Sequence, residues 1–227
     1  MQSNFNSVAV AVRKNLIEAE VTASLGHVHQ MLAAGLGYGS YASYKASGEE
    51  SPGLEGADFL ILDVEGIDVR AASLGYGDLG SVITQSIVAA IKGDPQPPQV
   101  FLDQQEFIDD VVCGYANDQA MNDDNVSNAA AETNAYFSGT SIESAEAPEP
   151  LKDSREFWEV PISGNVSMDQ DEDKPFSGNN ILVKGVVRVW KAGRVCLIDD
   201  MELDIGAGVD DSYYEMDEDL DASQLPA

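Results

Sequence analysis

Large apolar side chains between residues 7 and 35 recur at spacings of three and four, which is the period of an amphipathic helix. This pattern predicts two helices that pack against each other. Thr22 or Ser24 can cap the second helix, because a hydroxyl oxygen accepts a hydrogen bond from a free N–H of the first turn. Gly35 or Gly37 is expected to end it, since glycine adopts the left-handed conformation without a steric penalty.

Three tyrosines follow at the same helical spacing, Tyr38, Tyr41 and Tyr44. They predict a third short helix whose aromatic side packs back onto the first two. The segment 33–39 recurs with small changes at 71–77, and both copies read as the end of a helix followed by a glycine and a tyrosine. Two copies with unequal flanks indicate shared local chemistry rather than a repeat protein.

The middle of the chain gives weaker signals. Residues 59–62 read as a short buried strand, and residues 79–91 as a helix that ends before a run of prolines. Residues 99–113 mix apolar and acidic side chains and favour no element. Residues 114–150 are polar with few large apolar side chains, so we expect a linker or a loosely ordered loop there.

From residue 155 the apolar period changes to two, which is typical of strands with one buried face. The turn at 191–193 separates two such runs and predicts a hairpin. The sequence therefore predicts an α+β fold, a helical N-terminal region followed by a small antiparallel β-sheet module. The expected parts are listed in chain order: a helical region at 1–98, an acidic connecting segment at 99–154, the β module at 155–205 and a mobile acidic tail at 206–227.

The charge is the strongest compositional signal. The chain carries 40 Asp and Glu side chains against 12 Lys and Arg, a formal net charge of −28. Such a field repels nucleic acid, anionic membranes and anionic substrates, and it attracts basic protein surfaces. Two explanations require no partner, namely adaptation to high salt and a coat of carboxylates that confers solubility.

Cys113 and Cys196 both lie inside apolar runs, which favours buried, reduced thiols over a disulfide bond. The first residues lack the basic and apolar regions of a secretory signal, and no apolar run approaches the roughly 20 residues that span a membrane. We therefore expect a cytoplasmic protein.

The segment Gly-His-Val-His-Gln-Met-Leu-Ala-Ala-Gly-Leu-Gly-Tyr-Gly-Ser-Tyr-Ala-Ser-Tyr-Lys at 26–45 resembles a small helical module. It is similar to the N-terminal module of some bacterial glyoxalase-related proteins and of proteins from plasmids and integrated elements. The resemblance implies a compact helical fold and a setting in mobile genetic elements. It implies no glyoxalase activity, because that metal site needs several His and Glu ligands and the chain has only His27 and His29.

The sequence offers no catalytic or cofactor signature. His27 and His29 are two residues apart, so on a helix they point to different faces. The glycine-rich segments match neither a P-loop nor a dinucleotide-binding turn. A helix-turn-helix interpretation of 27–45 is disfavoured, because its second helix carries only Lys45 to neutralise phosphates. We expect no enzyme, no cofactor and no metal.

The residues 169–173 alternate carboxylates as a calcium loop does at its start. Lys174 stands where that loop needs its glycine, and Asn180 where it needs its terminal Glu, so an acidic loop is favoured. Together with a second acidic run at 199–204, these carboxylates are the predicted partner-binding residues. They are Asp199, Asp200, Glu202, Asp204, Asp169, Asp171, Glu172 and Asp173.

Carboxylates spaced along a folded surface can occupy the basic groove that a nucleic-acid-binding protein keeps for phosphates. We therefore expect a non-enzymatic acidic binding protein of phage or mobile-element origin. It would block a basic site on a host defence protein, as anti-CRISPR and anti-restriction inhibitors of the DNA-mimic type do. The alternative is an accessory or structural protein that forms homo-oligomers and uses its acidity for solubility or salt tolerance. An enzyme with an unrecognised site is a third, less favoured class.

Overall fold

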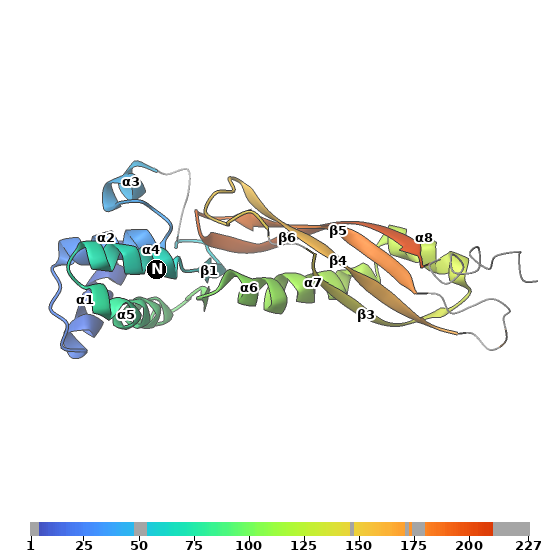
Figure 1. The fold of residues 1–227 in the computed structure, drawn as a ribbon, viewed down its shortest axis with the longest axis horizontal. Coiled ribbons are helices and arrows are strands. Elements are labelled where there is room, and N and C mark those ends of the chain that lie inside the picture. Colours follow the sequence, from blue (N-terminus) through green and yellow to red (C-terminus); the bar gives the residue numbers. More distant parts are fainter. Residues whose placement is uncertain (1–4, 48–53, 146–147, 171–172, 174–179, 211–227) are drawn as a thin grey trace, which may run out of the picture. The chain divides into compact units, whose positions relative to one another are not determined.

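The computed structural model describes residues 5–47, 54–145, 148–170, 173 and 180–210 (Figure 1). They form an α+β fold, as the sequence predicts. In chain order the elements are α1 (Phe5–Glu18), α2 (Leu25–Gly35), α3 (Tyr41–Ala46), β1 (Phe59–Ile61), α4 (Val64–Ser73), η2 (Gly77–Leu79), α5 (Gly80–Lys92), β2 (Gln99–Phe101), α6 (Gln104–Phe107), η3 (Ile108–Val112), α7 (Cys113–Ala120), α8 (Asp124–Thr133), β3 (Tyr136–Ser144), β4 (Phe157–Asp169), β5 (Ile181–Lys191) and β6 (Cys196–Val209).

The chain divides into two compact units, neither of which is continuous in sequence. The first unit comprises residues 1–108, 148–160 and 188–202, and the second comprises 109–147, 161–187 and 203–227. Strands β4, β5 and β6 each contribute one end to each unit.

Helices α1 and α2 confirm the predicted helix pair. Val8, Val12 and Leu16 recur at a spacing of four along α1, and all three are buried. Ser24 is the N-cap of α2, as predicted, because its Oγ accepts a hydrogen bond from the N–H of His27 at 3.2 Å. Helices α1, α2, α4 and α5 pack together in the first unit (Figure 1).

The two repeated segments end their helices in the same way. Gly37 and Gly75 have positive φ angles, of 79° and 88°. The N–H groups of Tyr38 and Tyr76 then donate to the carbonyl oxygens five residues earlier, at 2.9 and 2.8 Å. This is the Schellman arrangement, and it satisfies carbonyl groups that a helix end otherwise leaves free. The predicted helix ends are confirmed.

The predicted aromatic helix is confirmed as α3. The ring of Tyr44 stacks on Phe5 of α1 with centroids 4.2 Å apart, and the ring of Tyr41 stacks on His29 of α2 at 4.6 Å. Tyr38 meets Tyr44 edge to face at 5.2 Å. The three tyrosines thus hold α3 against both earlier helices, where each aromatic pair contributes about 0.5–1.5 kcal/mol beyond its buried area.

Strand β1, helices α4 and α5 and strand β2 form a parallel crossover. Leu60 lies opposite Val100 in the parallel β1–β2 pair. A parallel pair cannot be joined by a tight turn, so the chain crosses between the strands through two helices. Helix α5 confirms the helix predicted at 79–91, and β1 confirms the strand predicted at 59–62.

The prediction of a small antiparallel β module is wrong. The sheet has six strands in the order β2-β1-β6-β5-β4-β3, and it is mixed because β1 and β2 run parallel. Strands β1 and β2 have three residues each, which is too short for a period of two to appear. The helical part also extends beyond the N-terminal region, since α6, α7 and α8 follow β2.

The linker predicted at 114–150 is wrong for its described residues, which form α7, α8 and β3. The buried side chains of these helices are small: Ala116, Ala120, Val126 and Ala129. Alanine has the highest helix propensity but adds little to an apolar pattern. The sequence of α7 and α8 therefore appears polar and does not predict the two helices. Asp123 begins α8 by accepting the N–H of Asn125 at 2.8 Å.

Helix α7 lies beside β3, the last strand of the sheet, and its residue Asn117 covers part of the outer edge of that strand. Its side-chain amide donates to the carbonyl oxygen of Ile142 at 3.0 Å, and its amide oxygen accepts the N–H of Ile142 at 3.0 Å. Both backbone groups of this residue are therefore occupied by a side chain, which makes the bonds that a further strand would make.

The tail predicted from residue 206 begins inside a strand, because β6 continues through Val209. Residues 211–227 lie outside the described residues. Cys113 and Cys196 are free and buried, as predicted. Among the described residues, no helix has the length and apolar composition required to cross a membrane.

Candidate functional site

Three of the predicted carboxylates on β6 share one face of the strand. Asp200, Glu202 and Asp204 alternate with Met201 and Leu203, and all three are exposed. Side chains on one face of a strand are about 6.8 Å apart, whereas each strand of duplex DNA carries one charge per roughly 3.4 Å. This row alone therefore has about half the linear charge density of one DNA strand. Asp199 is exposed as well, but alternation places it on the other face.

One carboxylate of this β6 row, that of Glu202, is partly neutralised by an arginine. The guanidinium of Arg188 on β5 lies 3.7 Å from the carboxylate of Glu202 and donates to Glu159 of β4 at 3.0 Å. It also lies 5.9 Å from the ring centre of Phe157, within range of a cation–π contact. Glu202 is thus a member of an ion-pair network, and it contributes less free charge than Asp200.

The predicted residues at 169–173 do not join those of β6 into one cluster. Asp169 ends β4 and is exposed, and strand β5 lies between β4 and β6. Asp173 is exposed, while Asp171 and Glu172 lie outside the described residues. Strands β4 and β6 are two strand spacings apart, about 9.5 Å, and this distance is too long for direct contact between carboxylates.

The acidity is concentrated in the second unit. By sequence, this unit carries 20 acidic side chains against two lysines, a formal charge of −18 over 91 residues. The first unit carries 20 acidic and 10 basic side chains, a formal charge of −10 over 136 residues. Because each unit is assembled from three separate segments, reading along the chain does not separate the two sets.

A cavity of about 250 Å³ opens in the first unit, where the parallel strands β1 and β2 end. In open α/β sheets, the carboxyl ends of parallel strands are where ligands usually bind. The walls are largely apolar and include Leu62, Leu102, Leu151 and Val195. The charged lining residues are Asp63, Glu65, Asp103 and Lys152, a net formal charge of −2.

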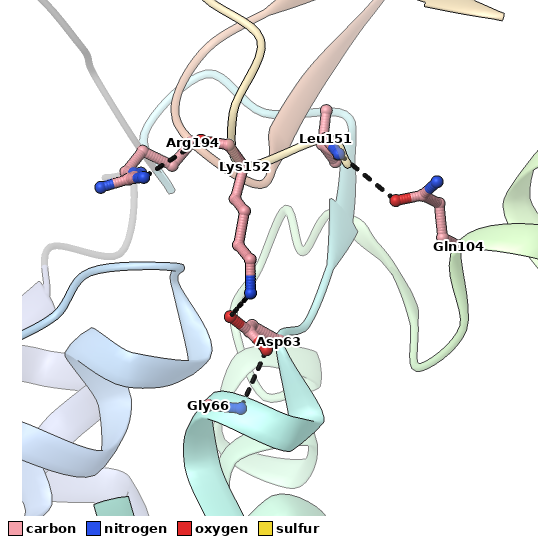
Figure 2. Close-up of polar contacts among 6 residues, drawn as sticks. All are labelled: Asp63, Gly66, Gln104, Leu151, Lys152 and Arg194. Atoms are coloured by element: carbon pink, nitrogen blue, oxygen red, sulfur yellow. Dashed lines mark hydrogen bonds and ion pairs between the residues drawn. The ribbon is translucent and has the colours of Figure 1, made fainter. Parts of the chain in front are cut away.

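Asp63 organises one side of this cavity (Figure 2). Its carboxylate caps α4 by accepting the N–H of Gly66 at 2.9 Å, and it accepts a hydrogen bond from the ammonium of Lys152 at 3.2 Å. Any side chain at position 66 would meet that carboxylate, since a Cβ there would lie 2.9 Å from it. Arg194 holds the main chain of Lys152 by donating to its carbonyl oxygen at 3.1 Å.

The other side is fixed by α6 and the segment before β4. The side-chain oxygen of Gln104 accepts the N–H of Leu151 at 3.3 Å (Figure 2). Asp103 caps α6 by accepting the N–H groups of Gln105 and Glu106 at 2.7 and 3.1 Å. The cavity is thus bordered by two helix starts, each closed by an aspartate.

Sequence reasoning missed both aspartates, although a signal exists. Each short strand is followed by Leu-Asp before a helix: Leu62-Asp63 lies between β1 and α4, and Leu102-Asp103 lies between β2 and α6. An apolar run followed by a potential N-cap marks a strand-to-helix turn. Two such turns on parallel strands predict a shared crevice.

Other candidate groups have structural roles. Burial lowers the pKa of Lys191 to about 8. Its ammonium donates to the carbonyl oxygens of Leu151 and Ser154 and so connects β5 to the segment before β4. His27 contacts the hydroxyl of Tyr76 at 2.9 Å, whereas His29 belongs to the aromatic stack. Within the described ranges, no three His, Cys, Asp or Glu side chains gather as metal ligands.

Compared with known proteins, the chain matches no family model, no curated protein and no solved structure. The similarity of residues 26–45 to a glyoxalase-related helical module therefore stays a prediction.

Proposed function

We propose that this protein is a non-enzymatic acidic binding protein that blocks a basic, nucleic-acid-binding site on another protein. The observation that carries the proposal is the uneven charge: the second unit holds 20 carboxylates and two lysines. Eleven of these carboxylates belong to the described residues. Eight of the eleven stand on η3, α7, α8 and strands of the sheet, and most are exposed, including Asp118, Glu132, Asp169 and Asp204. Carboxylates fixed on helices and strands lose less conformational entropy on docking than carboxylates on a flexible chain.

The proposed partner is a host defence protein that handles DNA or RNA, such as a CRISPR or restriction complex. A phage or mobile-element origin and action in the host cytoplasm belong to the same proposal. A basic groove built for phosphates attracts any dense array of negative charge, since the favourable terms are electrostatic steering and counterion release. The β6 row of Asp200, Glu202 and Asp204 has too low a charge density to imitate a DNA strand by itself. The proposal therefore assigns docking to the second unit, whose predicted residues include Asp169, Asp173 and Asp204.

The test is inhibition of DNA cleavage by two purified targets, a Cas9–guide complex and a type I restriction enzyme. We expect inhibition by the full-length protein to weaken steeply between about 50 and 200 mM salt, as phosphate contacts do. The variant Glu132→Lys/Asp169→Lys/Asp204→Lys reverses three exposed carboxylates of the second unit. At about 1 kcal/mol per reversed contact, inhibition of a responsive target should weaken roughly a hundredfold.

A matched control changes the net charge equally in the first unit. Glu18→Lys/Asp78→Lys/Glu106→Lys also reverses three exposed carboxylates. We expect it to weaken inhibition far less. Equal losses in the two variants, or no salt-sensitive inhibition of either target, would contradict the proposal. A protein that sediments as an oligomer and inhibits neither target would support the accessory, oligomerising alternative.

A further inference from the structure

The cavity at the ends of β1 and β2 combines apolar walls with acidic side chains. Helix starts often attract anions because their first N–H groups are free. Here Asp63 and Asp103 already accept N–H groups of both helix starts, at 2.7–3.1 Å. An anion would meet three lining carboxylates and one ammonium.

One cation, the ammonium of Lys152, already lies in the lining of the cavity. This ammonium lies 3.2 Å from the Asp63 carboxylate, whose side chain is only 15% exposed. Glu65 and Asp103 also line the cavity, are exposed, and come from different elements, α4 and the turn before α6. The charge of the lining therefore favours a second cation over an anion.

We infer that this cavity of the first unit receives one arginine side chain of the basic partner, in addition to the partner's contacts with the second unit, an inference that rests on the proposed function. A volume of about 250 Å³ is below the 300–1,000 Å³ typical of sites for drug-sized molecules, and it suits a single side chain. The methylene groups would lie against Leu102 and Leu151. The guanidinium has five donors and is weakly hydrated, so it serves two separate carboxylates better than an ammonium does.

The probe is n-butylguanidinium, followed by amide chemical shifts in NMR spectra of the full-length protein. We expect saturable shifts at Leu102, Gln104 and Leu151. The double variant Glu65→Gln/Asp103→Asn should bind the probe about tenfold more weakly, because two charge contacts are lost. Asparagine is also a good N-cap, so the start of α6 is retained. Glu106→Gln removes a charge from the same helix outside the cavity lining and should leave the affinity unchanged.

No saturable shift with n-butylguanidinium, stronger binding of n-butyrate, or unchanged affinity in the double variant would overturn the inference. n-Butylammonium should bind more weakly than the guanidinium, and the reverse order would overturn the choice of arginine. The probe experiment contains no partner protein. If the protein inhibits DNA cleavage but does not bind the probe, this inference alone is refuted. If the protein binds the probe but does not inhibit cleavage, the proposed function is refuted.

Discussion

Asp63 combines two stabilising roles that substitutions can separate. Its carboxylate caps α4 through the N–H of Gly66 and pairs with Lys152. Asp63→Asn keeps a capping oxygen but removes the charge, whereas Asp63→Ala removes both. Loss of an N-cap costs about 1 kcal/mol. The Lys152 side chain is 42% exposed, so solvent screens the ion pair and its loss costs about 0.5–1 kcal/mol.

The expected decrease in the free energy of unfolding is therefore about 0.5–1 kcal/mol for Asp63→Asn and about 1.5–2 kcal/mol for Asp63→Ala. Urea unfolding followed by tryptophan fluorescence measures it, because both tryptophans of the chain, Trp158 and Trp190, belong to the same unit as Asp63. Trp158 is fully buried and donates its indole N–H to the carbonyl oxygen of Glu149 at 2.8 Å, so its emission should respond to unfolding.

A double-mutant cycle isolates the ion pair. Lys152→Met should destabilise the wild type by about 0.5–1 kcal/mol and have little effect in the Asp63→Asn background. Equal destabilisation by Asp63→Asn and Asp63→Ala would refute the capping role. Additive effects of Lys152→Met and Asp63→Asn would refute the coupling between the two side chains.

Burial lowers the pKa of His29, so the unfolded chain binds a proton at a higher pH than the folded protein does. The wild type should therefore lose stability relative to His29→Phe as the pH falls below about 6.5. A difference in melting temperature between the two proteins that stays constant from about pH 7.5 to 5 would contradict this. Gly164→Ala should destabilise by about 2 kcal/mol, because its Cβ would lie 2.1 Å from the carbonyl oxygen of Ser141. Gly139→Ala is the matched control, since its Cβ would meet no atom within 4 Å; urea melts followed by circular dichroism should separate the two. Burial raises the pKa of Cys196 to about 12, so this thiol should react with Ellman's reagent only after unfolding, and rapid labelling of the native protein would refute the prediction.

The elements that could be predicted from the sequence are those with large side chains in a clear period. Val8, Val12 and Leu16 mark α1 because each buries a sizeable apolar group every turn. Gly37 and Gly75 mark helix ends because a left-handed residue leaves few alternatives to glycine. These signals are local, and the structure confirms them.

Elements stabilised by small or distant groups could not be predicted. The buried faces of α7 and α8 consist mainly of residues such as Ala116 and Ala129, which contribute little to a hydrophobic pattern. The cavity draws on four segments, represented by Asp63, Leu102, Lys152 and Val195, whose proximity depends on the crossover between β1 and β2. The predicted acidic residues are exposed where the structure describes them, but no local pattern revealed that two units divide the charge unequally.

The side chain of Asn117 has a consequence for how copies of this chain behave in a crowded cell. An open sheet edge grows by accepting another strand, and such growth is the first step of many fibrils. With both backbone groups of Ile142 already bonded to Asn117, an incoming strand meets an interrupted row of donors and acceptors near the end of β3. It would have to displace the Asn117 side chain before it could bond to Ile142. One amide therefore limits templated growth at an edge of the second unit, which also carries most of the net negative charge.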